Sequence, residues 1–183
     1  MRSLILAGGR SSRMGEDKSL MEVEGVAFIQ RVAMTLAEAG LEPIRISVGS
    51  PEDIDSYGKV LDSSLQVEWV IDSSPYAGPV EAILEALSDP FCHNPLQLAP
   101  VDVPWLEMGL LIDLENQIGE GMLAVPISSG RLHPLLALVR PGVSTSIGDS
   151  RRPLREQFLE MGAVLVEVDE STVRNVNRPS DLE

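Results

Sequence analysis

The chain has 183 residues, of which 44% are hydrophobic and 23% are charged. This composition is typical of a globular protein and excludes membrane-spanning helices, because no apolar run approaches the ~20 residues that a bilayer requires. Acidic residues outnumber basic ones by 28 to 14, so we expect neither nucleic acid nor an anionic membrane as a partner. Cys92 is the only cysteine, which rules out an intramolecular disulfide. Since the N-terminal residues lack a signal-peptide pattern, we expect a cytoplasmic protein.

Hydrophobic periodicity predicts strands that alternate with helices along the chain. We expect strands over 1–6, 43–48, 65–71, 96–101, 122–127, 132–139 and 163–168, and a short strand and turn over 20–25. We expect helices over 28–39, 53–58, 78–87 and 104–118, and a last one in the region 150–161 after Pro153. Such alternation favours βαβ units and a parallel sheet, whereas the short turn before 132–139 predicts one antiparallel pair. We therefore predict a single domain over 1–183 with a three-layer α/β/α Rossmann-like fold. Its sheet would be mostly parallel with an antiparallel strand, and ligands would bind beyond the carboxyl ends of the strands.

The loop after the first strand reads LAGGRSSRMGEDKSL, from Leu6 to Leu20. Its glycines allow backbone N–H groups to approach a phosphate, and Arg10, Arg13 and Lys18 supply positive charge. The loop is not a Walker A motif, because its third glycine precedes glutamate instead of lysine. It is not a GxGxxG motif either, because its first two glycines are adjacent. The sequence thus predicts a phosphate-binding loop, and the alternative is a glycine-rich surface loop with scattered charges.

Polar or glycine residues follow several predicted strands. They are Gly8 and Gly9, Asp72, Asp102, Asn175 and Asn177. Because carboxyl ends of parallel strands share one edge of a sheet, these residues can converge, and their carboxylates and amides are oxygen ligands suited to Mg²⁺. Asp102 lies between two valines, where a carboxylate must be paired, hydrogen-bonded or metal-bound. We expect Asn175 and Asn177 on a short strand, where alternation places both on the same face. The alternatives are an N-cap role for Asp102 ahead of the helix after Pro104, and a turn at the asparagines.

The loop LAGGRSSRMGEDKSL resembles the N-terminal motif of the molybdenum cofactor guanylyltransferases, in the MobA-like nucleotidyltransferase family. Three shorter segments are similar to later motifs of that family: Asp102-Val103-Pro104, Asp72 with Ala77-Gly78-Pro79, and Asn175-Val176-Asn177. The resemblance implies a Mg²⁺-dependent transfer of GMP from GTP to the terminal phosphate of molybdopterin, the organic part of the molybdenum cofactor. The products would be molybdopterin guanine dinucleotide and pyrophosphate, and molybdoenzyme chaperones would be candidate partners.

The resemblance also assigns roles to residues. It implies that Arg13, Lys18 and Asp102 are catalytic and that Asp102 and Asn177 hold the metal. The residues implied to bind the nucleotide are Leu6, Ala7, Gly8, Gly9, Lys18, Asp72, Gly78, Asp102, Asn175 and Asn177.

Two further segments resemble the family, each with a structural alternative. His133-Pro134 is similar to a His-Pro that opens a family strand, and a lone histidine is more often structural. Arg151, Arg152 and Arg155 resemble a basic segment facing the second substrate, and the alternative is a solvated helix start. The sequence departs from the family at Glu81, where relatives carry a small residue, and at Gly49, where they tend to carry asparagine near the base.

Other activities remain open from the sequence. The same chemistry with CTP, or with a sugar or alcohol phosphate as acceptor, is one alternative. A non-catalytic nucleotide-binding module that delivers molybdenum cofactor is another.

Overall fold

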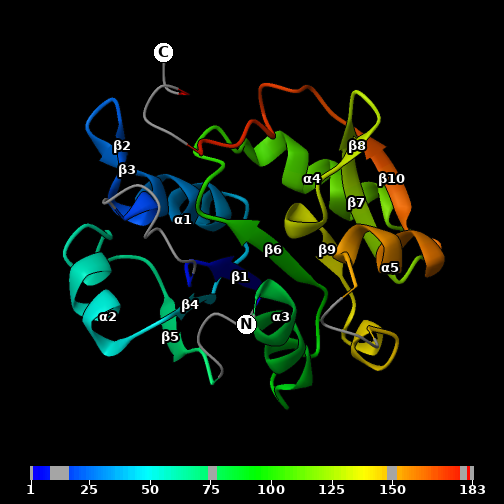
Figure 1. The fold of residues 1–183 in the computed structure, drawn as a ribbon, viewed down its shortest axis with the longest axis horizontal. Helices are drawn as coiled ribbons and strands as arrows, with labels where there is room; N and C mark the ends of the chain where they lie inside the picture. The colour runs from blue at the N-terminus through cyan, green and yellow to red at the C-terminus, as the bar shows by residue number, and fades with distance from the viewer. Residues whose placement is uncertain (1, 9–16, 74–77, 148–151, 178–180, 182–183) are drawn as a thin grey trace.

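A central β-sheet organises the protein in the computed structural model, which describes residues 2–8, 17–73, 78–147, 152–177 and 181 (Figure 1). In this part of the chain the sheet has eight strands in the order β10-β7-β9-β6-β1-β4-β5, with β8 paired to β7. The strands are β1 (Ser3–Leu6), β4 (Ile44–Val48), β5 (Val67–Ile71), β6 (Leu96–Pro100), β7 (Leu123–Ser128), β8 (Arg131–Leu132), β9 (Leu138–Val139) and β10 (Val164–Glu167).

Strand pairing is parallel where the chain crosses over a helix and antiparallel where it turns back. The pairs β1–β4, β1–β6, β4–β5 and β7–β10 are parallel, whereas β9 runs antiparallel to β6 and β7, and β8 antiparallel to β7. The predicted mixed sheet is confirmed. Leu6 pairs with both Ser47 and Pro100, so the carboxyl ends of three neighbouring strands lie level.

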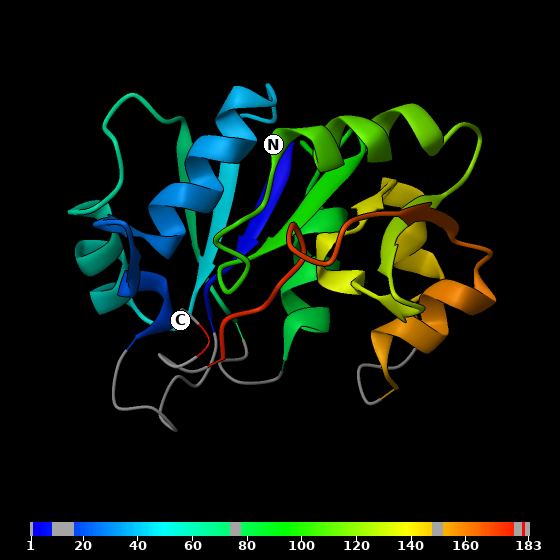
Figure 2. The ribbon, with the colours of Figure 1, turned by 90° about the horizontal axis from the view of Figure 1, so that it is seen from above.

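Helices cover both faces of the sheet. They are α1 (Phe28–Glu38), α2 (Pro51–Gly58), α3 (Pro79–Ser88), α4 (Met108–Gln117) and α5 (Leu154–Glu160). Figure 2 shows α1 and α4 on one side of the sheet and α3 and α5 on the other. Because strand side chains alternate between faces, Ile5 belongs to the core under α1 and α4, and its neighbour Leu4 to the core under α3 and α5. The predicted three-layer α/β/α architecture is therefore confirmed.

Short elements complete the fold. They are the hairpin of β2 (Glu22–Val23) and β3 (Val26–Ala27) and the 3₁₀ helices η2 (Lys18–Leu20), η3 (Pro134–Leu136) and η4 (Pro141–Thr145). None of the described helices combines the length and the hydropathy needed to cross a bilayer.

Three sequence predictions are wrong in detail. The strand expected over 132–139 is interrupted at Pro134, whose lack of an N–H prevents a continuous ladder, and η3 separates β8 from β9. The helix expected from Pro104 begins at Met108, because a turn closed by the Leu106 N–H and the Val103 carbonyl (3.1 Å) precedes it. The segment 175–177 forms no strand.

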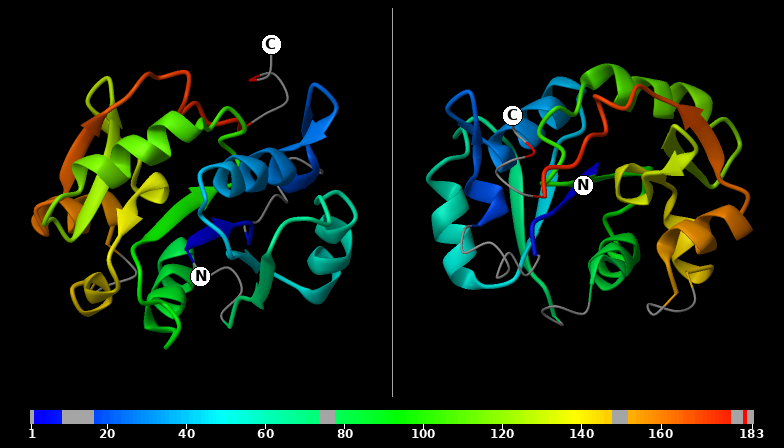
Figure 3. Two further views of the ribbon diagram at one scale, coloured as in Figure 1. Left: turned by 180° about the vertical axis from the view of Figure 1, so that it is seen from behind. Right: turned by 45° about the horizontal axis from the view of Figure 1, so that its top comes forward.

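The segment after β10 crosses much of the molecule. From β10 at one edge of the sheet it returns along α4 toward α1 (Figure 3). Near its far end Val176 is buried in a small apolar cluster with Met21 and Phe28. This burial fixes the asparagines on either side of Val176 next to the carboxyl edge of the sheet.

Candidate active site

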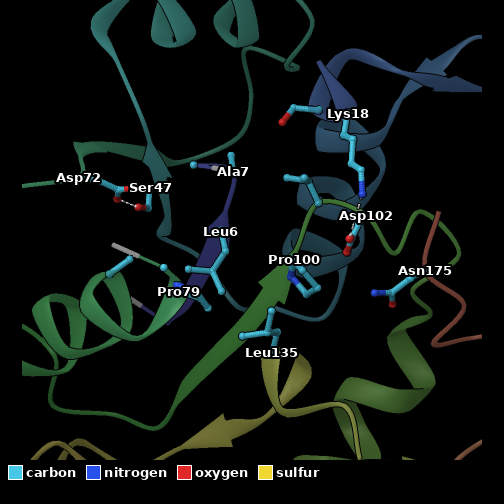
Figure 4. Close-up of a pocket in the computed structure, with 15 residues that line it drawn as sticks. Leu6, Ala7, Lys18, Ser47, Asp72, Pro79, Pro100, Asp102, Leu135 and Asn175 are labelled. Atoms are coloured by element: carbon cyan, nitrogen blue, oxygen red, sulfur yellow. Dashed lines mark hydrogen bonds and ion pairs between the residues drawn. The ribbon is translucent and has the colours of Figure 1, made fainter. Parts of the chain in front are cut away.

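A cleft of about 400 Å³ opens at the carboxyl edge of the sheet, between η2 and α3 (Figure 4). Strand ends form its floor, and η2, α3 and η3 contribute walls. Its lining residues are Leu6, Ala7, Gly8, Lys18, Ser19, Ser47, Asp72, Gly78, Pro79, Ala82, Pro100, Val101, Asp102, Leu135 and Asn175. The fold thus brings together residues that the sequence places in eight separate segments.

Most residues expected to bind the nucleotide lie in this cleft. They are Leu6, Ala7, Gly8, Lys18, Asp72, Gly78, Asp102 and Asn175. Asn177 is not among the lining residues but contacts Lys18. Gly9 and Arg13 lie outside the described residues, and so does Arg10.

Lys18 is held at the cleft by a chain of polar contacts. Asp17 caps η2 by accepting a hydrogen bond from the Ser19 N–H (2.9 Å). The Tyr57 hydroxyl on α2 in turn donates to Asp17 Oδ2 (2.7 Å). Burial raises the pKa of Tyr57, and the contact with Asp17 adds to this shift. Lys18, the first residue of η2, is therefore held in place by the N-cap of η2, which α2 stabilises in turn.

The Lys18 ammonium group joins the two residues expected to hold a metal. Its Nζ donates to Asn177 Oδ1 at 2.9 Å and lies 3.7 Å from Asp102 Oδ2. Burial raises the pKa of Asp102, and the positive charge of Lys18 opposes this shift without cancelling it. Asp102 Oδ1 is buried and has no hydrogen-bond partner among the described residues.

Asp102 does not cap a helix. The N-cap of α4 is Glu107, so the structural alternative for Asp102 is wrong. Instead, the Asp102 carbonyl accepts a hydrogen bond from the Val176 N–H (2.8 Å), which attaches the C-terminal segment to the cleft. Beside this contact, Asn175 lies near Asp102 (Figure 4).

Asp72 and Ser47 form a second polar pair on the opposite side of the cleft from Lys18 and Asp102 (Figure 4). The Ser47 hydroxyl donates to Asp72 Oδ1. Burial raises the pKa of Asp72, and the hydrogen bond from Ser47 works in the other direction. A Cβ atom at Gly8 would collide with Asp72 Oδ2, so any other residue at this position would displace the Asp72 carboxylate from its present place.

Sequence reasoning missed Ser47 and the apolar wall made by Ala82, Pro100 and Leu135. The only signal for Ser47 was a hydroxyl within a strand of buried apolar residues, which calls for a hydrogen-bond partner. The wall carried no signal, since apolar residues on α3, β6 and η3 are equally suited to the core.

The remaining candidates lie away from the cleft lining. His133 is half-buried at the start of η3, and desolvation lowers its pKa. Arg152 forms an ion pair with Glu160 on α5 at 2.5 Å, and Arg155 is exposed, while Arg151 lies outside the described residues. The unusual Glu81 is exposed on α3 and does not line the cleft.

The donors at the cleft fit a hard divalent cation. The unpartnered Asp102 Oδ1 and the amide oxygen of Asn177 are ligands of the kind that Mg²⁺ prefers. In the described ranges no three His, Cys, Asp or Glu side chains gather into a metal-binding group. A cation here would therefore take much of its coordination from phosphates and water, as is usual for Mg²⁺.

The fold and this cleft define the class of protein: a Rossmann-like nucleotidyltransferase. Residues 3–159 match the family described as the MobA-like NTP transferase domain, and the chain belongs to that family. The resemblance stated from the sequence is thereby confirmed.

Named relatives match along nearly the whole chain. The molybdenum cofactor guanylyltransferase of Pseudomonas fluorescens is 30% identical, with 98% of this chain and 90% of that protein covered. The enzyme of the same name from Rhizobium rhizogenes is 29% identical, covering 97% and 87%. In fold, the chain is similar to molybdopterin-guanine dinucleotide biosynthesis protein A from Archaeoglobus fulgidus (TM-score 0.67, 19% identity, covering 100% and 95%).

Proposed function

We propose that the protein is a Mg²⁺-dependent molybdenum cofactor guanylyltransferase. It would transfer GMP from GTP to the terminal phosphate of molybdopterin, releasing pyrophosphate. The names of its full-length relatives support the substrates. The observation that carries the reaction type is the placement of Lys18 beside the half-buried Asp102, whose Oδ1 has no hydrogen-bond partner among the described residues, at the edge of a nucleotide-sized cleft.

The chemistry requires positioning more than proton transfer. In this reaction a pterin phosphate oxygen bonds to the α-phosphorus of GTP while the bond to the pyrophosphate oxygen breaks. A phosphate is already ionised at neutral pH, so no general base is needed. Orientation of the two phosphates and neutralisation of their charge are then the main sources of rate.

Each side of the cleft has its own task in this proposal. Asp102 and Asn177 would hold Mg²⁺, which when bound neutralises phosphate charge. Lys18, with Arg13, would stabilise the leaving pyrophosphate, and the Gly8–Gly9 backbone would hold the nucleotide. Asp72 and Gly78 would border the nucleoside.

Lys18 would change partners as the nucleotide binds. Its ammonium group lies near Asp102 and Asn177. A bound triphosphate would attract the ammonium group more strongly than these two residues do, because it offers several negative oxygens in place of one carboxylate and one amide. The lysine would then move toward the phosphates and leave the oxygens of Asp102 available to the cation.

A competition assay tests the proposal. Purified protein, molybdopterin and Mg²⁺ are mixed with equimolar GTP, CTP, ATP and UTP, and the dinucleotide products are identified by mass. We expect the guanine dinucleotide alone. Because Gly49 stands where relatives tend to carry asparagine, CTP is the informative competitor, and a cytosine product would overturn the choice of base.

Variants separate catalysis from binding. Asp102→Ala should lose turnover while remaining folded, whereas Asp113→Ala, at an exposed carboxylate on α4, should behave as the wild type. Normal turnover by Asp102→Ala would remove the metal assignment. Nucleotide binding by the wild type without any product would instead favour the binding-module alternative.

A further inference from the structure

Ser47 is a buried polar residue next to the end of β4, a strand whose other residues are apolar except Arg45. It is 3% exposed in β4, and its backbone carbonyl accepts a hydrogen bond from the Ala7 N–H (3.0 Å), where the glycine loop begins. Its hydroxyl donates to Asp72 Oδ1. One residue thus contacts both the start of the loop and the carboxylate on the side of the cleft away from Lys18.

The Asp72 carboxylate has few other restraints. It follows the edge strand β5, and its backbone N–H donates to the Val48 carbonyl (2.9 Å). Among the described residues only Ser47 donates a hydrogen bond to its side chain. The other oxygen, Oδ2, lies against Gly8. The hydroxyl therefore decides which way this half-buried carboxylate points.

The ligand chemistry at Asp72 follows from charge. Lys18 is on the opposite side of the cleft (Figure 4), where the phosphates of a nucleotide would find a cation. A carboxylate repels phosphate and, when ionised, only accepts hydrogen bonds. The group that meets Asp72 is then a hydrogen-bond donor of the nucleoside, either a ribose hydroxyl or a base N–H.

We propose that Ser47 is a positioning residue for nucleotide recognition, because its hydroxyl holds Asp72 as an ionised acceptor directed at a donor group of the nucleoside. This inference rests on the proposed function in one respect, that the ligand is a nucleoside triphosphate. If the hydroxyl had only a structural role, its removal would still lower stability, but it would change the affinity for every nucleotide equally.

The test is a set of binding measurements on matched variants. Ser47→Ala removes the hydroxyl, and Ser47→Thr retains it. Ser3→Ala is the control, because Ser3 is fully buried in the neighbouring strand β1 and donates to the Leu41 carbonyl (2.8 Å), but does not line the cleft. Calorimetry gives the Kd of each variant for GTP, 2′-deoxy-GTP, 3′-deoxy-GTP, inosine triphosphate and inorganic triphosphate.

We expect Ser47→Ala to weaken GTP binding about tenfold, as loss of a hydrogen bond to a charged group does. Ser47→Thr should restore most of the affinity, and Ser3→Ala should lower stability without changing Kd. One analogue will lack the donor group that bonds to Asp72. For that analogue, the Kd of Ser47→Ala should equal the Kd of the wild type, because the wild type has lost the same hydrogen bond. The identity of that analogue tells a ribose hydroxyl from the guanine amino group. Binding of inorganic triphosphate should be equal in both proteins.

A second readout is the pH dependence of binding. Without the Ser47 hydroxyl, the pKa of Asp72 rises further, so on acidification GTP affinity should fall at a higher pH in Ser47→Ala than in the wild type. Unchanged GTP affinity in Ser47→Ala, or an equal loss for every ligand including inorganic triphosphate, would overturn the role of Ser47 alone. Failure of the wild type to bind any nucleotide would overturn the proposed function and this inference together.

Discussion

In the variant Asp102→Asn, a neutral amide replaces a carboxylate that the fold buries at a net cost. Burial raises the pKa of Asp102 despite the nearby Lys18 ammonium, and Oδ1 lacks a hydrogen-bond partner in the described part of the chain. A carboxyl whose pKa is higher in the folded than in the unfolded state destabilises the fold once it is ionised. The destabilisation is fully present above the folded-state pKa and absent below the unfolded-state one.

The size of the effect follows from the local contacts. An ionised carboxylate that lacks a hydrogen bond at its buried Oδ1 costs more to bury than a neutral amide in the same place, by about 1–3 kcal/mol. Part of that cost is already offset, since Lys18 lies 3.7 Å from Oδ2, and an asparagine oxygen could still accept from the lysine. We therefore expect a net gain in unfolding free energy of about 1 kcal/mol, which for a chain of this size raises Tm by roughly 2–4 °C.

Thermal unfolding at neutral pH, repeated at decreasing pH, measures this gain. The advantage of Asp102→Asn should shrink as the pH falls toward the ordinary pKa of an aspartate, roughly 4. Asp113→Asn, at an exposed carboxylate of α4, is the control and should leave Tm unchanged. The same Asp102→Asn protein should lose nucleotidyl transfer by roughly a hundredfold or more.

A Tm at or below that of the wild type at neutral pH would refute the reasoning, because attraction to Lys18 would then outweigh the cost of burial. A gain in Tm that did not depend on pH would also contradict it, since ionisation of Asp102 would not be the cause.

Two other variants test how Lys18 is used and held. Lys18→Met should bind Mn²⁺ about tenfold more tightly than the wild type without nucleotide, because a cation 3.7 Å from Asp102 Oδ2 no longer competes. Electron paramagnetic resonance measures the free Mn²⁺, and weaker binding would show that the lysine and the metal do not share Asp102. Tyr57→Phe removes the hydrogen bond to Asp17 and should cost about 1 kcal/mol of stability. It should also weaken GTP binding several-fold in calorimetry, and unchanged binding would mean that η2 holds Lys18 without help from α2.

Local patterns in the sequence were sufficient for most elements. Helix α1 was predictable because Phe28, Val32 and Leu36 recur at helical spacing and are all buried. The start of α4 was not, because buried Val103 and Leu106 hold the chain in a turn first, and burial is not a local property.

The residues of the site also fall into those that local sequence patterns predict and those that depend on the fold. The glycine loop and Asp102 were identifiable from short motifs. The contact between Lys18 and Asn177 joins residues 159 positions apart and depends on burial of Val176. Ser47 could not be assigned to the site from the sequence, because its place there depends on the strand register that sets it beside Leu6 and on its hydrogen bond to Asp72.

The bond between Val176 and Asp102 also has a consequence for protein synthesis. Translation proceeds from the N-terminus, so η2, which carries Lys18, and the turn after β6, which carries Asp102, leave the ribosome long before Val176 and Asn177 do. A nascent chain can assemble β1, β4 and β6 while its cleft still lacks the residue that touches the lysine. Under the proposed function, the metal site would then gain Asn177 late in translation, after the surrounding sheet is in place.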